Sequence, residues 1–92
     1  MDAHTVWREF FQNWPKGLPR TGVLVTNYDE QVPFAGFMTS DTMLLIERRA
    51  PDTIGARKVL VPYCNVLAIK LVEVARAKVF QASGFAGELP NE

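Results

Sequence analysis

The stretch FAGFMTSDTMLLIERR, residues 34–49, holds two runs of strand-forming residues on either side of a polar bend. Aromatic and branched apolar residues dominate both runs, Phe34–Ser40 and Thr42–Arg49, which is typical of neighbouring β-strands. Asp41 lies at the bend, where we expect its carboxylate to accept backbone hydrogen bonds in an Asx-type turn. Gly36 interrupts the first run and fits a sharply bent strand. The stretch therefore predicts an antiparallel hairpin with a bent first strand.

Three further runs of the same kind flank this hairpin. Thr21–Tyr28 precedes it, Ala56–Pro62 follows it, and Val66–Val72 comes last. Turn-forming residues separate the runs, with a turn expected at residues 29–31 and a longer loop at residues 50–55. Five strands at regular spacing, with no helical pattern between them, predict a mainly β fold. We expect an antiparallel meander that curls into a small, strongly bent barrel over about residues 20–72.

A different periodicity marks the N-terminal residues. Trp7, Phe10, Phe11 and Trp14 recur at the i, i+3, i+4, i+7 spacing that places side chains on one face of a helix. The pattern predicts a helix over about residues 3–14, which Pro15 would end. We expect its aromatic face to pack on the protein's own sheet or on a neighbouring copy.

Residues 73–92 form a C-terminal extension of the predicted barrel. Within it, residues 74–82 either lengthen the last strand or form a short helix, because the periodicity is compatible with both. The residues from Gly84 onward are expected to be loose. A chain of 92 residues has room for one domain, which we take to span the whole sequence, residues 1–92.

Charge and hydropathy exclude several classes of partner. Ten basic residues balance ten acidic ones, so no global field attracts nucleic acid or an anionic membrane. The longest apolar stretch is interrupted by polar residues, short of the roughly 20 apolar residues that a spanning helix needs. The N-terminus lacks the pattern of a secretory signal. These features predict a cytoplasmic protein that does not associate with membranes.

The sequence also lacks the motifs of common catalytic and nucleotide sites. It contains no P-loop, GxGxxG, HExxH or CxxC pattern. We expect His4 to be solvated or to cap the helix, and Cys64 to be a buried, inert thiol. The prediction is a protein that is not an enzyme and has no metal or cofactor. A small hydrolase built on Cys64 or Asp41 is the least favoured alternative.

Four basic residues gather around the predicted long loop. Arg48 and Arg49 precede it, Arg57 and Lys58 follow it, and few acidic residues lie nearby. Because the flanking strands bring the ends of the loop together, these side chains are candidates for a local anion-binding patch. The alternative is that they are solvated charges that discourage edge-to-edge aggregation.

Two segments, Phe34–Ile46 and Val59–Ile69, resemble the signature segments of the Sm-like family of small β-barrels. The resemblance covers about residues 5–72 and implies a helix followed by a bent five-stranded barrel. It further implies a ring of subunits, in which the fourth strand of one copy pairs with the fifth strand of the next. Single-stranded RNA, which many members bind at the pore, is a further implied partner.

The resemblance places the implied RNA site at Met43 and at the turn carrying Tyr63, Cys64 and Asn65. Tyr63 would stack on a base and Asn65 would read a base edge. Met43 has no aromatic ring and the turn has no basic residue, so we expect weak RNA binding. The leading hypothesis is a non-enzymatic, homo-oligomeric binding or scaffolding module. The alternative is an SH3-like domain that holds a peptide or a protein partner with its aromatic side chains.

Overall fold

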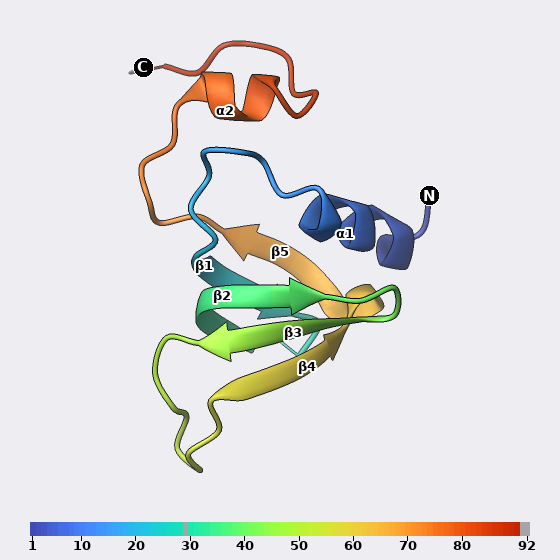
Figure 1. Ribbon diagram of the computed structural model, residues 1–92, viewed down its shortest axis with the longest axis vertical. Helices are drawn as coiled ribbons and strands as arrows, with labels where there is room; N and C mark the ends of the chain where they lie inside the picture. Colours follow the sequence, from blue (N-terminus) through green and yellow to red (C-terminus); the bar gives the residue numbers. More distant parts are fainter. Residues whose placement is uncertain (29, 91–92) are drawn as a thin grey trace.

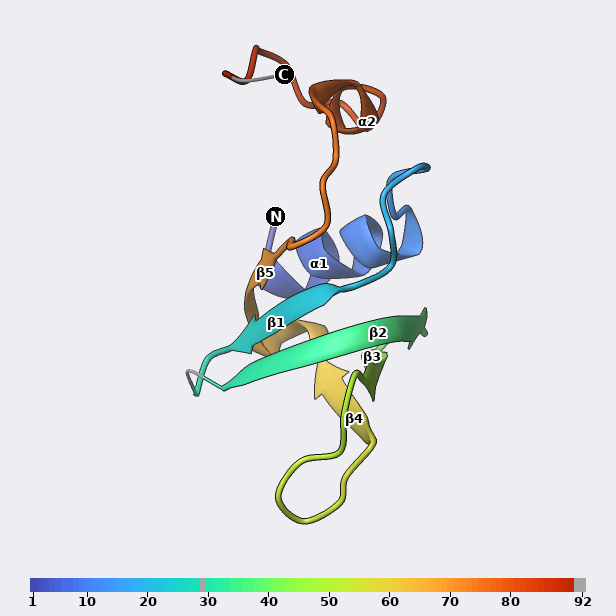
Figure 2. The same cartoon turned by 90° about the vertical axis from the view of Figure 1, so that its left-hand side faces the viewer.

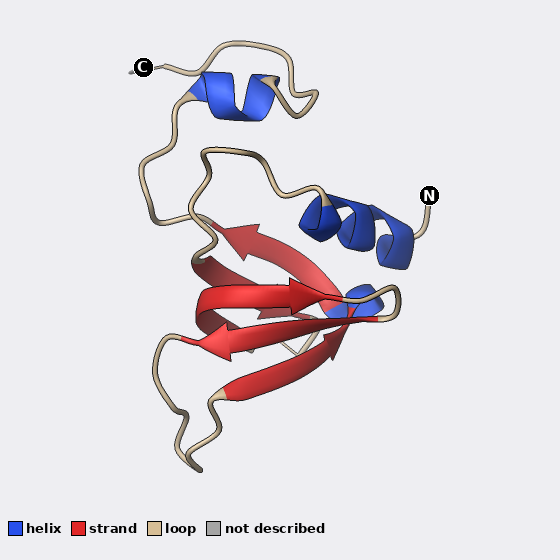
Figure 3. Cartoon of the chain, viewed as in Figure 1, coloured by secondary structure: helices blue, strands red, loops and turns tan. Residues whose placement is uncertain are grey.

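The computed structural model describes residues 1–28 and 30–90, and it confirms a mainly β fold with an N-terminal helix (Figures 1 and 3). Helix α1 is followed by five strands, a 3₁₀ turn η1 lies between the last two strands, and helix α2 comes after them. The bounds are α1 Ala3–Gln12, β1 Gly22–Thr26, β2 Gln31–Thr39, β3 Met43–Arg48, β4 Lys58–Pro62, η1 Tyr63–Asn65, β5 Val66–Lys70 and α2 Ala77–Gln81.

The five strands form one antiparallel sheet in the order β4-β3-β2-β1-β5. The first four strands are a meander, and β5 returns to pair with β1, as the predicted curling requires. Among the described residues β4 and β5 are the two edges of the sheet and do not pair with each other. The sheet is therefore strongly curved, as expected from the sequence, and its closure into a barrel is not confirmed.

Two irregularities and one close approach produce the curvature. The β2–β3 register shifts between Phe34 and Gly36, and the β1–β5 register shifts between Val25 and Thr26. Such bulges bend a strand and increase its twist. At Gly22, a Cβ atom would lie 2.7 Å from the carbonyl oxygen of Lys70, so only glycine lets β5 come this close to β1.

Strand β2 begins at Gln31, three residues earlier than the sequence predicted, and it includes Pro33. In an antiparallel pair, every second residue of a strand bonds to a given neighbour. The Thr26 N–H donates to the Glu30 carbonyl, so in β2 residues 32 and 34 bond to β1. Pro33 therefore needs no N–H toward β1, and its carbonyl accepts the Arg49 N–H at 3.0 Å. The turn expected at residues 29–31 is shorter as a result, and Asp29 lies outside the described residues.

Helix α1 packs one aromatic residue fully into the core. Asp2 caps it by accepting a 2.8 Å hydrogen bond from the Thr5 N–H, and this bond lowers the pKa of the Asp2 carboxyl. Phe11 is 1% exposed and meets the Phe37 ring edge-on, with centroids 5.0 Å apart. The expected packing of this face on the protein's own sheet is confirmed at Phe11, whereas Trp7, Phe10 and Trp14 are half-buried.

The C-terminal residues form a separate small element. The chain leaves β5 at Lys70, two residues before the predicted end of that strand, and residues 71–76 have no regular structure. Helix α2 follows, so the helical alternative for residues 74–82 is the correct one. Figures 1 and 2 show α2 standing apart from the sheet at the end of this extended segment. No helix within residues 1–28 and 30–90 combines the length and apolar character needed to cross a membrane.

Candidate interaction surfaces

The β3–β4 loop brings together part of the predicted basic cluster. The Arg48 N–H donates to the Arg57 carbonyl at 2.7 Å, so these residues lie opposite each other at the ends of β3 and β4. Lys58 is partly neutralised, because its ammonium lies 2.8 Å from the Glu47 carboxylate. Arg49 and Arg57 have exposed side chains. The cluster therefore exists at the base of the loop, with Lys58 committed to an ion pair.

Asp52 holds the same loop in one conformation. Its carboxylate accepts the N–H groups of Ala56 at 2.8 Å and Ile54 at 2.9 Å, and its own N–H donates to the Ala56 carbonyl. Gly55 supplies the positive φ of 86° that the turn requires. The bond from Ala56, with further contributions from Ile54 and Arg48, holds the pKa of Asp52 below its ordinary value. The loop projects from the sheet (Figure 2). The Ile54 side chain in this loop is exposed.

Tyr63 does not lie where the implied RNA site needs it. The side chain is 0% exposed, its hydroxyl donates to the Ser40 carbonyl at 2.7 Å, and burial raises its pKa. The His4 ring packs edge-on against it at 5.5 Å, so His4 is half-buried and is not the solvated residue we expected. A buried ring offers no face to a base, and the expectation that Tyr63 stacks on RNA is wrong for this fold.

The remaining residues of the implied site point in different directions. Asn65 is half-buried, and its side-chain oxygen accepts a 3.4 Å hydrogen bond from the Asn27 amide. Met43 is exposed on the outer face of β3, opposite Pro62. Cys64 is exposed, contrary to the buried thiol we expected. The structure therefore does not bring Met43, Tyr63 and Asn65 together as one pocket.

The bend between β2 and β3 is organised by Ser40 and not by Asp41. The Ser40 hydroxyl oxygen accepts the N–H of Met43 at 2.9 Å and that of Thr42 at 3.3 Å. The Asp41 carboxylate instead accepts a 3.3 Å hydrogen bond from the Gln12 side chain. The Asx-type turn expected at Asp41 is therefore replaced by the serine equivalent.

An apolar depression on the outer face of the sheet was missed in the sequence. It has a volume of about 280 Å³ and is lined mainly by Met38 of β2, Met43 and Leu45 of β3, and Leu60 of β4. Leu60 is 62% exposed. These residues alternate along their strands with buried ones. The sequence therefore did indicate the depression, because β3 and β4 have apolar residues at the positions of both faces.

The two edges of the sheet carry backbone groups that pair with no other strand of the described part of the chain. The Arg48 N–H donates to the Arg57 carbonyl, so residues 57, 59 and 61 bond to β3. The N–H and C=O groups of Lys58 and Leu60 therefore point away from β3. On β1, residues 22, 24 and 26 bond to β2, so residues 23 and 25 bond to β5 at Lys70 and Ala68. The backbone groups of Ile69 consequently face the open side of β5.

Among residues 1–28 and 30–90, no cluster of three or more His, Cys, Asp or Glu side chains is placed to hold a metal ion. A comparison of the chain with protein-family models, with curated proteins and with solved structures found no match. The Sm-like likeness thus rests on the two short segments and on the order of one helix and five strands.

Proposed function

We propose that this chain is a non-enzymatic assembly module, whose copies join through their sheet edges into a homo-oligomeric binding or scaffolding unit. The observation that carries the proposal is the pair of unpaired edges, β4 and β5, in one small curved sheet. An exposed edge with a free ladder of backbone groups is a template for strand addition.

The two edges are compatible with each other. Lys58 and Leu60 present outward N–H and C=O groups on β4, and Ile69 does so on β5. Exposed apolar side chains accompany both edges, Leu60 on β4 and Leu67 on β5. Because the interface would join two different patches, an open assembly keeps one free edge at each of its two ends until a ring closes. Size favours such pairing, since a chain of about 90 residues buries a modest fraction of its surface alone.

The placement of the aromatic side chains favours this proposal over an SH3-like peptide-binding domain. Such a domain would offer aromatic rings to its peptide. Here Phe11, Phe34, Phe37 and Tyr63 are buried in the core, and Trp7 and Trp14 pack against it. The largely exposed rings, Tyr28 after β1 and Phe85 after α2, lie on separate segments of the chain.

RNA binding enters the proposal only as a weak, phosphate-directed contribution. Arg49 and Arg57 are exposed at the loop base, whereas Tyr63 is buried and Asn65 contacts Asn27. Contacts of this kind neutralise phosphates without reading bases, so they give salt-dependent and sequence-independent binding.

The experiment is the mass in solution of the wild type and of two matched variants, measured by light scattering. Leu60→Lys puts a charge on the β4 edge, and Ile54→Lys makes the same change at the exposed loop tip, away from both edges. Both side chains are exposed in the single chain, so both variants should fold, which far-ultraviolet circular dichroism checks. We expect an oligomer for the wild type and for Ile54→Lys, and a smaller mass for Leu60→Lys. A wild-type mass of 10.3 kDa at micromolar concentration, or no effect of Leu60→Lys, contradicts the proposal.

A further inference from the structure

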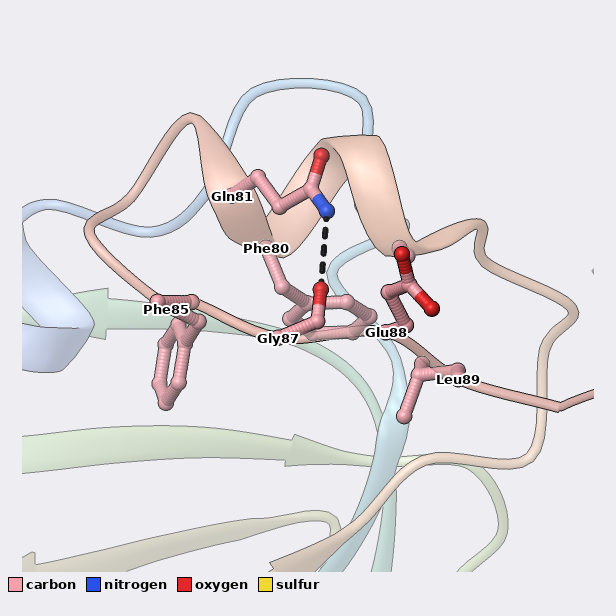
Figure 4. Close-up of a pocket in the computed structure, with 8 residues that line it drawn as sticks. Phe80, Gln81, Phe85, Gly87, Glu88 and Leu89 are labelled. Carbon is pink, nitrogen blue, oxygen red and sulfur yellow. Dashed lines mark hydrogen bonds between the residues drawn. The ribbon is translucent and has the colours of Figure 1, made fainter.

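The segment that follows β5 is an arm with its own internal structure. We define the arm as residues 76–90, which include α2. Phe85 folds back beneath α2, where its N–H donates to the Phe80 carbonyl at 3.1 Å and the two rings meet edge-on at 6.2 Å. The Gln81 amide donates to the Gly87 carbonyl at 3.2 Å (Figure 4). These bonds and the ring contact join residues of the arm to one another.

The arm touches a groove on the rest of the molecule but fills it incompletely. The groove has a volume of about 270 Å³, and its walls are Val6, Trp7 and Phe10 of α1, Ile69 and Leu71 at β5, and Phe85 of the arm. Phe85 is still 57% exposed there, and Val6 is exposed as well. In Figure 4 the Phe85 side chain points away from α2. The groove is thus an apolar seat that the arm of the same chain occupies only in part.

In the connection between β5 and the arm, the strand propensity of the sequence disagrees with the observed structure. Leu71, Val72 and Val74 favour strands, and the sequence predicted that the last strand continues to Val72. In the structure the strand stops at Lys70, and Val74 is 96% exposed. Continuing the β1–β5 register would place Val72 opposite Thr21. The strand propensity of this segment is thus left unsatisfied by the fold, which gives it a local reason to extend β5 when the arm is displaced.

We propose that residues 71–75 are a hinge, and that the arm of one copy seats Phe85 in the α1–β5 groove of a second copy. The occupant follows from the intrachain arrangement, because this side chain and this groove already meet within one chain. Exchange between copies keeps those contacts and frees the hinge to extend β5. Five extended residues span up to about 17 Å, which carries the arm off its own groove. The exchange uses α1 and the arm, and it does not require the edge pairing proposed above.

The test is cross-linking between chains that carry one cysteine each, in a Cys64→Ser background. One chain carries Val6→Cys in the groove, and the other carries Ala86→Cys beside Phe85. The two are mixed and treated with a short bismaleimide, and the linked peptides are identified by mass spectrometry. We expect a covalent dimer joined through positions 6 and 86, at least ten-fold more abundant than the dimer from a matched mixture of Ile54→Cys with Ala86→Cys.

Two further variants make the result specific. Adding Phe85→Ala to the arm chain should remove the excess product, and because Phe85 is largely exposed this change should leave the fold intact. Adding Leu60→Lys to both chains should leave the product in place, so failure of edge pairing and failure of arm exchange are separable. The proposal is overturned if the Val6→Cys mixture gives no more dimer than the Ile54→Cys mixture, or if Phe85→Ala leaves its yield unchanged.

Discussion

Two adjacent phenylalanines of α1 allow the packing to be tested with one chemical change made twice. Phe11 is fully buried, stacks on Trp14 with ring centroids 5.6 Å apart and meets Phe37 edge-on. Phe10 is half-buried and lines the open groove. Removing a buried phenyl ring costs about 3 to 5 kcal/mol, because the lost transfer free energy is joined by the cost of a cavity. At Phe10 the ring already contacts solvent, so we expect about 1 to 2 kcal/mol.

These magnitudes are large against the stability of the whole domain. At about 0.05 to 0.15 kcal/mol per residue, a chain of this length has roughly 5 to 14 kcal/mol in total. Phe11→Ala should therefore lower the melting temperature by at least about 12 °C, at roughly 4 °C or more per kcal/mol. Urea unfolding followed by far-ultraviolet circular dichroism measures both variants without relying on the neighbouring tryptophans. Equal losses, or a larger loss for Phe10→Ala, would refute the assignment of Phe11 as the residue that anchors α1.

Three more outcomes follow from the described contacts. The lowered pKa of Asp52 means that its stabilisation of the loop is present above the ordinary carboxyl pKa of 3.8 and is lost as the pH falls through the lower folded value. The protection of the loop amides, measured relative to their intrinsic exchange rates, should then fall on acidification in the wild type but not in Asp52→Ala. Tyr63→Phe should cost about 1 kcal/mol through the lost bond to the Ser40 carbonyl. Because the pKa of Tyr63 is raised, the free energy of unfolding of the wild type should also fall as the pH rises past the ordinary value of 10.0. The free energy of unfolding of Tyr63→Phe should fall less, and the urea midpoints of the two proteins measure the difference. Fluorescence anisotropy with a uridine-rich oligonucleotide should give a Kd no tighter than about 10⁻⁶ M at physiological salt. Arg57→Ala should weaken this binding more than Asn65→Ala, and nanomolar affinity abolished by Asn65→Ala would show instead that the base-reading site is intact.

The architecture was predictable because its signals are local and periodic. Aromatic spacing located α1, and branched apolar runs located all five strands. Their ends were less predictable: Pro33 argued against a strand, and only the pairing pattern shows that the β1–β2 ladder makes no use of an N–H at this position. Lys70 ends β5 although Leu71 and Val72 have strand propensity, because no described residue pairs with them there.

The candidate site was harder to predict because successive side chains of a strand point to opposite faces of the sheet, so each residue must be assigned to the correct face. Val59, Val61 and Tyr63 alternate and point inward, so the same alternation turns Leu60 and Cys64 outward. Applied to the sequence, that pattern indicates a buried Tyr63 and an exposed Cys64, the reverse of our expectations. The choice between Ser40 and Asp41 at the bend had no such signal, because both side chains are able to cap a turn.

The return of β5 to β1 has a consequence for how the chain acquires this structure. Strands β1 to β4 pair with their sequence neighbours, whereas the β1–β5 pair encloses residues 27–65. Closing a loop of about 40 residues costs roughly 3 kcal/mol of chain entropy before any contact of that pair compensates for it. Non-local pairing of this kind slows folding. Until β5 arrives, the β1 side of the meander is itself an unprotected edge, so the nascent chain passes through a period in which a different pair of strands is open to association.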